Sequence, residues 1–161
     1  MILAIDPGNK ESGWCVIDDN YKPVEFGKWE NHILEGWLIL ADKLPYKIDN
    51  AVIERISNYG QAVGDTVHDT NIAIGRFEIC LELSHIPFEL VKRKTYITDL
   101  TGSSRVNDAG IRLYLADRFA SGEKNYGKGT KNNKGWFYGF SADMWSAYCI
   151  AVWRLDKENA I

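Results

Sequence analysis

The run MILAIDPGNKESGWCVIDD, residues 1–19, decides the fold of this chain of 161 residues. Its first apolar stretch, Met1–Asp6, ends in Asp-Pro-Gly, which is a turn signal, and its second, Gly13–Asp18, ends in Asp-Asp-Asn. Two apolar stretches joined by a turn predict adjacent strands of a hairpin. Asp6 is therefore expected at the end of a strand, beside the turn.

The rest of the chain alternates between strand and helix patterns. Short apolar runs predict three more strands, over Val24–Glu30, Ala51–Ile56 and Phe88–Val91. Apolar residues three and four positions apart predict four helices, over Ile33–Leu44, Asp65–Ser84, Asn107–Phe119 and an amphipathic Ser141–Lys157. The expected N-caps are Asn107 or Asp108, and Ser141. We expect one α/β domain over residues 1–161, with a single five-stranded mixed sheet flanked by helices and a long loop at Gly122–Gly139.

The composition is that of an ordinary globular protein, with 45% apolar, 12% aromatic and 25% charged residues. The three cysteines lie in apolar segments without a CxxC pair, which predicts buried thiols and disfavours structural zinc or a disulfide framework. Every apolar run is well short of the ~20 residues that span a bilayer, and the N-terminus lacks a signal layout. We therefore expect a cytoplasmic protein without a membrane partner.

The charge is distributed unevenly along the chain. The total of 19 Lys and Arg against 22 Asp and Glu gives a net charge of −3, which is unpromising for a partner of DNA. Residues 92–134, however, hold ten basic and four acidic residues, a balance of +6, so the remainder carries −9. Such asymmetry indicates either a nucleic-acid face or a solvated surface.

Three acidic residues stand where a simple surface carboxylate is unexpected. Asp6 ends a strand, Glu54 interrupts the apolar run AVIERI, and Asp143 lies in the first turn of the last helix. Each also has an ordinary explanation, as a turn cap, an exposed edge-strand residue and a partner of the helix dipole, respectively. Together they predict a shared cation, because carboxylate oxygens suit Mg²⁺ and Mn²⁺. Two such ions would clamp a scissile phosphate.

This ordered set of motifs resembles RuvC-type Holliday-junction resolvases. IDPGNKESGWCVI, residues 5–17, resembles the opening hairpin of that family, and Val52-Ile53-Glu54 resembles its second acidic strand. Ser141-Ala142-Asp143, followed by an Ala-rich apolar stripe, resembles its final helix. Any one motif is weak, whereas the set in this order over almost the whole chain is specific.

The phage-borne branch of the family is the most similar in its remaining motifs. These are Arg118-Phe119, the loop Gly129-Thr130-Lys131-Asn132 and Asp143-x-Trp145-Ser146-Ala147. The resemblance implies an RNase H-like fold and a homodimeric crossover junction endodeoxyribonuclease of DNA recombination and repair, in a bacterial or phage-infected cytoplasm. It would cut four-way junctions, forks and related branched DNA by two-metal-ion hydrolysis with Mg²⁺ or Mn²⁺, leaving paired nicks with 5′-phosphate and 3′-hydroxyl ends. The implied catalytic and metal-binding residues are Asp6, Glu54 and Asp143.

Ser146 departs from the pattern of the cellular members, which carry a second acid at this place on the last helix. Positions i and i+3 share a helix face, so Ser146 would still point toward the site, as a neutral and weaker ligand than a carboxylate. Either water or Ser146 completes the metal shell, or a fourth acid does. Asp108 and Asp117 are the nearest acids in sequence.

Basic side chains are expected to bind the phosphates of the DNA. Lys92, Lys94 or Arg105 would supply a cation near the scissile phosphate. The loop with Lys124, Lys128, Lys131 and Lys134 would lie along a DNA backbone, or is simply solvated. Tyr59 would stack on or wedge between bases, or else pack inside the protein or its dimer.

The helix expected over Asp65–Ser84 has a second apolar face beyond the one that packs on the sheet. This face is formed by Ile72, Ala73, Ile79 and Leu83. We expect it to form the homodimer, in which two-fold symmetry places two sites on equivalent strands of a four-way junction.

Two other functions remain open from the sequence. A non-catalytic binder of branched DNA with the same fold would follow from incomplete metal coordination at Ser146. An ATP-binding domain like those of actin and sugar kinases also opens with a strand ending in Ile-Asp-x-Gly. The chain length, Glu54 and Asp143 disfavour this last possibility.

Overall fold

Five strands form one mixed sheet in the computed structural model, which describes residues 1–57 and 64–160. The order across the sheet is β3-β2-β1-β4-β5, with β1 to β3 antiparallel and β1, β4 and β5 parallel. The strands are β1 (Ile2–Asp6), β2 (Glu11–Ile17), β3 (Pro23–Glu30), β4 (Asn50–Arg55) and β5 (Phe88–Lys92). The predicted α/β class and five-stranded mixed sheet are confirmed.

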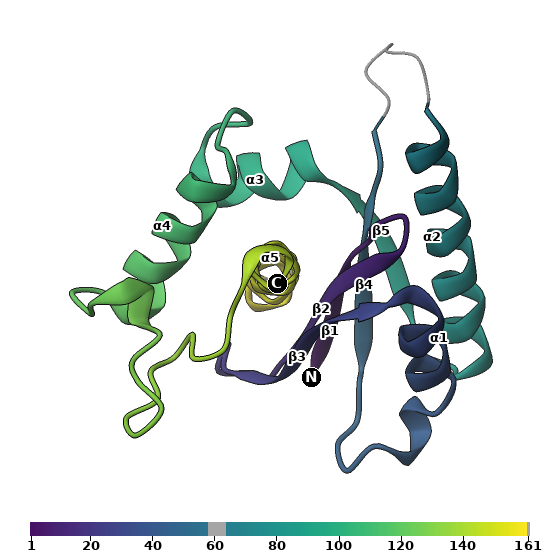
Figure 1. The fold of residues 1–161 in the computed structure, drawn as a ribbon, viewed down its shortest axis with the longest axis horizontal. Helices are drawn as coiled ribbons and strands as arrows, with labels where there is room; N and C mark the ends of the chain where they lie inside the picture. Colours follow the sequence, from purple (N-terminus) through teal and green to yellow (C-terminus); the bar gives the residue numbers. More distant parts are fainter. Residues whose placement is uncertain (58–63, 161) are drawn as a thin grey trace.

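The helices cover the two faces of the sheet unequally. Helices α1 and α2 pack on one face, whereas α5 lies on the other and is itself covered by α3 and α4 (Figure 1). The helices are α1 (Asn31–Ile39), α2 (Asp65–Leu83), α3 (Arg93–Thr101), α4 (Asp108–Ala120) and α5 (Ala142–Asn159), with short 3₁₀ turns η1 (Ala41–Lys43) and η2 (Asn125–Gly127). In the described residues no helix is long and apolar enough to span a membrane.

Alternation along the central strands decides which side chains meet α5. In β1, Ile2 and Ala4 belong to the apolar cluster that contains α5, whereas Leu3 and Ile5 pack with α1 and α2. Successive residues of a strand point to opposite faces. The next position of the first set is Asp6, which therefore faces α5. In β4 the same alternation places Val52 and then Glu54 on the α5 face.

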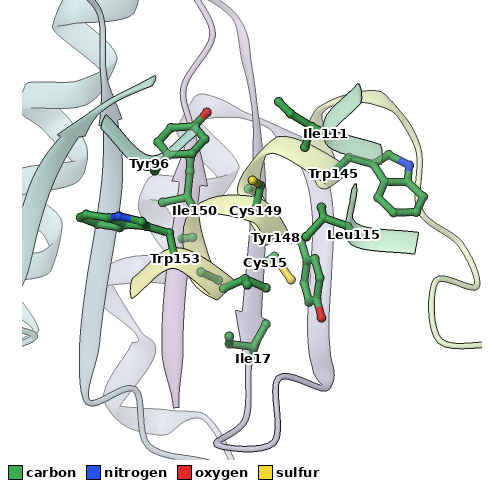
Figure 2. Close-up of a cluster of buried hydrophobic side chains, with 14 of the residues drawn as sticks. Cys15, Ile17, Tyr96, Ile111, Leu115, Trp145, Tyr148, Cys149, Ile150 and Trp153 are labelled. Carbon is green, nitrogen blue, oxygen red and sulfur yellow. The ribbon is translucent and has the colours of Figure 1, made fainter. Parts of the chain in front are cut away.

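Helix α5 is the centre of the larger core cluster, and this corrects the expectation of an amphipathic helix. Every residue from Trp145 to Trp153 is buried. Figure 2 shows why: Tyr148, Cys149 and Ile150 stand between side chains of β2 and those of α3 and α4. A helix covered on both sides has no solvated face over this stretch. The 122–140 segment, which contains the expected loop Gly122–Gly139, also joins this core, through Phe137 and Phe140.

Three local predictions were wrong in detail. Helix α1 ends at Ile39, and the segment up to Lys43 becomes the turn η1. Helix α3 was not anticipated, because it begins within the basic cluster Lys92-Arg93-Lys94, with Lys92 as its N-cap. Ser141 stands at the N-cap of α5 but makes no capping hydrogen bond. The Asn107 cap of α4 is confirmed, since its Oδ1 accepts from the Gly110 N–H at 2.9 Å.

Buried thiols are confirmed for all three cysteines, which are free. They are Cys15, Cys80 and Cys149.

Candidate active site

Asp6 and Glu54 lie side by side at one end of the sheet. In the parallel register of β1 and β4, Ile5 stands opposite Ile53, so one further residue along each strand places Asp6 beside Glu54. Neighbouring strands are about 4.8 Å apart. Both carboxyl groups point toward α5, and its first turn supplies Asp143. The three acids predicted from the sequence therefore converge.

Gly13 permits the close approach of α5 to the sheet. This residue is paired with Asp6 across β1 and β2. A Cβ atom at position 13 would lie 2.6 Å from the carbonyl oxygen of Asp143 and 2.8 Å from its Cβ, which is closer than atoms can pack. The glycine of the opening motif thus has a structural reason: it leaves room for the start of α5 over the carboxylate of Asp6.

The turn after Asp6 is tied to α1 by a small buried network. The Ser12 hydroxyl donates to Asn31 Oδ1 at 2.7 Å and accepts from the Gly8 N–H at 3.2 Å, while Asn31 Nδ2 donates to the Gly8 carbonyl at 2.9 Å. Buried polar groups that satisfy one another fix a single local geometry. The network therefore holds the end of β1, and with it Asp6, in place.

Asp6 is the most perturbed carboxyl of the site. Its pKa is raised to about 8, mainly by burial and further by the nearby carboxylates of Glu54 and Asp143, while Arg93 and a hydrogen bond with the Ser146 hydroxyl act in the opposite direction. Desolvation and like charge both favour the neutral acid. Such an environment is suited to an additional positive charge beyond that of Arg93.

Glu54 is held by α3. The Tyr96 hydroxyl donates to Glu54 Oε2 at 2.6 Å, and Arg93, which forms an ion pair with Asp108, lies nearby. Burial raises the pKa of Glu54, and the Tyr96 hydrogen bond and the Arg93 charge partly offset this effect. Helix α3 thus orients the second carboxyl and brings a guanidinium to the same place.

Asp143 is paired with a cation of the opposite sheet edge. Lys28 Nζ lies 2.7 Å from Asp143 Oδ2 and 3.7 Å from Glu11 Oε2. The register explains this contact, because Asp6 pairs with Gly13 and Gly13 pairs with Lys28 across three adjacent strands. The sequence analysis missed Lys28, although correct alignment of the first three strands would have indicated it.

Two adjoining pockets surround these groups. One of about 160 Å³ holds Asp6 and Asp143 and is lined by Asp6, Arg93, Asp108, Ile111, Arg112, Ala142, Asp143, Trp145 and Ser146. The other, of about 530 Å³, begins at Glu54 and is lined by Glu54, Arg55, Ile56, Ser57, Arg93, Lys94 and Ser104. Arg93 lines both and so connects them. We call the first the catalytic pocket.

The other predicted site residues are distributed between the site and the surface. Ser146 and Asp108 line the catalytic pocket, whereas Asp117 lines a different surface pocket near Tyr126. Lys94 lines the pocket beside Glu54; within the described residues Lys92 and Arg105 line neither. Arg93 lines both pockets, and the sequence analysis passed over it between its two lysine neighbours.

The lysines of the 122–140 segment do not reach either pocket. Lys124, Lys131 and Lys134 are exposed and Lys128 is half-buried, and Lys134 Nζ lies 5.0 Å from the centre of the Tyr138 ring. Their predicted role therefore concerns DNA outside the catalytic pocket. Tyr59 lies outside the described residues.

The donor set of the site fits a hard divalent cation. Three carboxylates and a hydroxyl gather at this end of the sheet in two adjoining pockets, and oxygen ligands are those that Mg²⁺ and Mn²⁺ prefer. In residues 1–57 and 64–160, no three acidic, His or Cys side chains lie as close together as the ligands of a bound ion. Asp143 is instead paired with Lys28, and Glu54 accepts a hydrogen bond from Tyr96.

Neither family models nor curated sequences match the chain, whereas solved structures match it over nearly its whole length. A Thermus thermophilus RuvC structure matches with a TM-score of 0.68 at 12% identity, covering 99% of this chain and 96% of that one. T. thermophilus RuvC in complex with Holliday junction substrate matches with a TM-score of 0.71 at 11% identity, covering 99% and 94%. Fowlpox virus resolvase in complex with Holliday junction DNA matches with a TM-score of 0.59 at 15% identity, covering 98% and 99%. The chain therefore has the RNase H-like fold of the RuvC-type resolvases.

Proposed function

We propose that this protein is a structure-selective DNA endonuclease that resolves Holliday junctions and related branched DNA. The observation that carries the proposal is the convergence of Asp6, Glu54 and Asp143 at one end of the sheet. This convergence occurs in a fold shared with RuvC and a poxvirus resolvase, and two of the matching structures are complexes with Holliday junctions.

Asp6, Glu54 and Asp143 would hold two Mg²⁺ ions, with Ser146 as a further ligand and Mn²⁺ as a substitute. Bound there, divalent ions stabilise both the attacking and the leaving oxygen when a phosphodiester is hydrolysed to 5′-phosphate and 3′-hydroxyl ends. The chain itself orients these groups. Tyr96 fixes the Glu54 carboxyl, and Arg93 directs positive charge toward a phosphate between the two pockets.

The basic stretch would bind the arms of the junction. Lys94 continues the pocket beside Glu54, and the exposed lysines of the 122–140 segment extend the positive surface. Contacts of this kind are made to the DNA backbone, and they weaken steeply with salt because bound counterions are released. The proposed contacts are Lys92, Lys94, Arg105, Lys124, Lys128, Lys131 and Lys134.

A homodimer formed through α2 would place two sites on one junction. Ile72, Ile79 and Leu83 are 60%, 57% and 65% exposed on the outer side of this helix. Ala73, which the sequence analysis assigned to the same face, is buried against the sheet instead. A two-fold interface buries the same apolar patch of both copies and gives paired nicks by symmetry.

Cleavage of a labelled synthetic four-way junction tests the proposal. With Mg²⁺ or Mn²⁺, the native chain is expected to nick two strands symmetrically. Asp6→Asn and Glu54→Gln should each lower the rate about a thousandfold or more while still binding the junction, because they remove charge from the acid cluster without removing the DNA surface. Asp19→Asn makes the same chemical change at an exposed acid away from both the site and α2 and should cut normally.

Two other results would contradict the proposal. Tight binding without cleavage in either metal identifies a non-catalytic junction-binding protein. A thermal shift with Mg²⁺-ATP and no binding of junction DNA identifies a nucleotide-binding domain.

A further inference from the structure

Arg112 is a half-buried guanidinium at the catalytic pocket that the proposed chemistry does not use. It comes from α4 and lines the pocket together with Asp6, Asp143 and Ser146. Its Cζ lies 5.4 Å from the centre of the Tyr126 ring and 5.9 Å from that of Trp145. Rings within about 6 Å of a cation attract it and limit its motion. The two rings therefore hold this guanidinium at the pocket wall.

Arg112 differs from the other cations of the site in lacking a counter-charge. Lys28 is paired with Asp143, and Arg93 is paired with Asp108. Asp108 lies one helical turn before Arg112 and could have paired with it, but its carboxylate binds Arg93 instead. Among the described residues Arg112 has no carboxylate within salt-bridge distance, and its buried Nε has no hydrogen-bond partner. A buried donor without a partner carries a desolvation cost that an anionic ligand would remove.

The backbone that positions Tyr126 is strained. Asn125 and Tyr126 adopt left-handed conformations, with φ of 52° and 56°, before Gly127 at 70°. The left-handed conformation is tolerated by asparagine but disfavoured for tyrosine, because its Cβ approaches the following carbonyl oxygen. Gly127 is buried here, and a Cβ on it would lie 2.2 Å from the Cβ of Ala120, so η2 packs tightly on the end of α4. This strained turn brings the Tyr126 ring to Arg112.

We propose that Arg112, held between Tyr126 and Trp145, binds a phosphate oxygen of the DNA strand that enters the catalytic pocket. This inference rests on the proposed function, and it assigns a substrate contact to a residue outside the acid cluster. A guanidinium offers a planar fork of donors that matches two phosphate oxygens at once. Arg93 lines the same pocket, so the strand would meet a second guanidinium there.

A purely structural role is the competing explanation, in which Arg112 only ties η2 and α5 to α4. The two roles differ in the salt dependence of DNA binding. Each phosphate contact contributes about 0.9 to the slope of log K against log salt concentration, whereas a structural tie contributes nothing. The Tm of the DNA-free protein separates the two roles as well. Substitution of Arg112 should lower this Tm if the residue is a structural tie, and should leave it unchanged if the residue only contacts DNA.

The experiment measures junction binding by fluorescence anisotropy between low and high salt, with Mg²⁺ present. All variants are made in an Asp6→Asn background, which prevents cleavage.

Arg112→Gln should weaken binding roughly tenfold and lower the salt slope by about one. Arg112→Lys should keep the slope and lose part of the affinity. Tyr126→Asn, which suits the left-handed backbone, should weaken binding less than Arg112→Gln. Lys22→Gln, at an exposed lysine on another part of the surface, is the control of equal charge and should change neither quantity.

Each outcome decides one question. If the Asp6→Asn parent binds the junction and Arg112→Gln has the same slope and affinity as Lys22→Gln, the inference is wrong and the proposed function stands. If the parent does not bind junction DNA, the proposed function itself fails. Should Arg112→Gln not fold, Arg112→Lys decides: reduced affinity at an unchanged Tm supports the contact, and unchanged affinity overturns it.

Discussion

The two faces of the sheet are completed in different ways. On one face α5 is enclosed by α3, α4 and the 122–140 segment, and all the candidate catalytic groups lie on this side. On the other face α2 is the outermost layer, and it leaves apolar side chains in solvent. On the first face, the layer over the sheet is itself covered by other segments of the same chain. On the second face, α2 has the exposed apolar surface expected of a helix that packs against another copy of the protein.

The largest expected effect is on stability and concerns Asp6. This residue ends β1 on the enclosed face, where its ionised carboxylate is costly to bury. An unfolded Asp loses its proton near pH 3.8, whereas in the fold the pKa of Asp6 is raised to about 8 by burial and by two neighbouring acids. Between these values the folded state binds the extra proton, so stability falls as pH rises through this window. Each pKa unit corresponds to about 1.4 kcal/mol. In EDTA, Asp6→Asn should therefore raise Tm by several degrees at pH 7.5 and change it little at pH 4.

Differential scanning fluorimetry across pH, with and without Mg²⁺, checks this prediction. Mg²⁺ should raise the Tm of the native protein more than that of Asp6→Asn, because the ion replaces the missing positive charge. Asp19→Asn, at an exposed acid, should follow the native pH profile. A native Tm that rises steadily from pH 4 to pH 8 in EDTA would show that Asp6 is not buried as a perturbed acid.

The second prediction concerns the exposed apolar side chains of α2 and the dimer that they are proposed to form. Ile72 and Ile79 lie on one exposed stripe of α2, with Arg76 between them paired with Glu35 of α1. Replacing both isoleucines with Glu places like charges opposite each other across a two-fold interface. The dimer dissociation constant should rise at least about a hundredfold, or roughly 2.7 kcal/mol, in analytical ultracentrifugation.

The control for this prediction is Leu113→Glu. Leu113 is 58% exposed on α4, in the layer that covers α5, so its replacement makes a similar chemical change on the other face. It should leave the oligomeric state unchanged. Symmetric paired nicking should become uncoupled single nicking in the α2 variant alone. If the native protein is monomeric at micromolar concentration, α2 does not form the proposed dimer interface.

Much of the fold was predictable because its signals are local. Short apolar runs bounded by turns marked all five strands, and the side-chain amide of Asn107 marked the start of α4. The α5 helix was found but its environment was not, because burial on both sides depends on α3 and α4, which pack from elsewhere in the chain. Helix α3 was missed for a related reason: its first turn is basic, and its buried face is only Tyr96 and Ile97.

The carboxylates of the site were predictable and their cations were not. Asp6 ends a strand, Glu54 interrupts an apolar run and Asp143 lies at a helix start, so their settings, taken together, single them out in the sequence. Lys28 and Arg93 stand in no unusual local pattern. Lys28 reaches the site through the register of β2 and β3, and Arg93 reaches it because α3 begins at that residue. Arg112 stands out because it has no ion pair and its Nε has no hydrogen-bond partner within the described residues. Neither feature can be recognised without the positions of the neighbouring side chains.

The third prediction tests the enclosed face at the start of α4. Asn107→Ala removes the side-chain acceptor of the Gly110 N–H and should lower the free energy of unfolding by about 1 kcal/mol in urea denaturation. Ser141→Ala is the matched control, because Ser141 occupies the same place on α5 without making a capping bond. It should cost much less. Equal losses for the two variants would mean that residual helix propensity, rather than the cap, accounts for the effect.

The smallest effect is expected at Lys28, where the enclosed face meets the sheet edge. Its ammonium lies 2.7 Å from Asp143 and competes with any other cation for that carboxylate, although solvent screens the pair because both side chains are more than a third exposed. Removal of the competing charge should therefore tighten metal binding only modestly. We expect Lys28→Gln to lower the Mn²⁺ dissociation constant about threefold in isothermal titration calorimetry, whereas Lys22→Gln leaves it unchanged. Weaker binding in Lys28→Gln would mean that Lys28 positions Asp143 for the metal, and that the ion pair supports the site rather than competing for it.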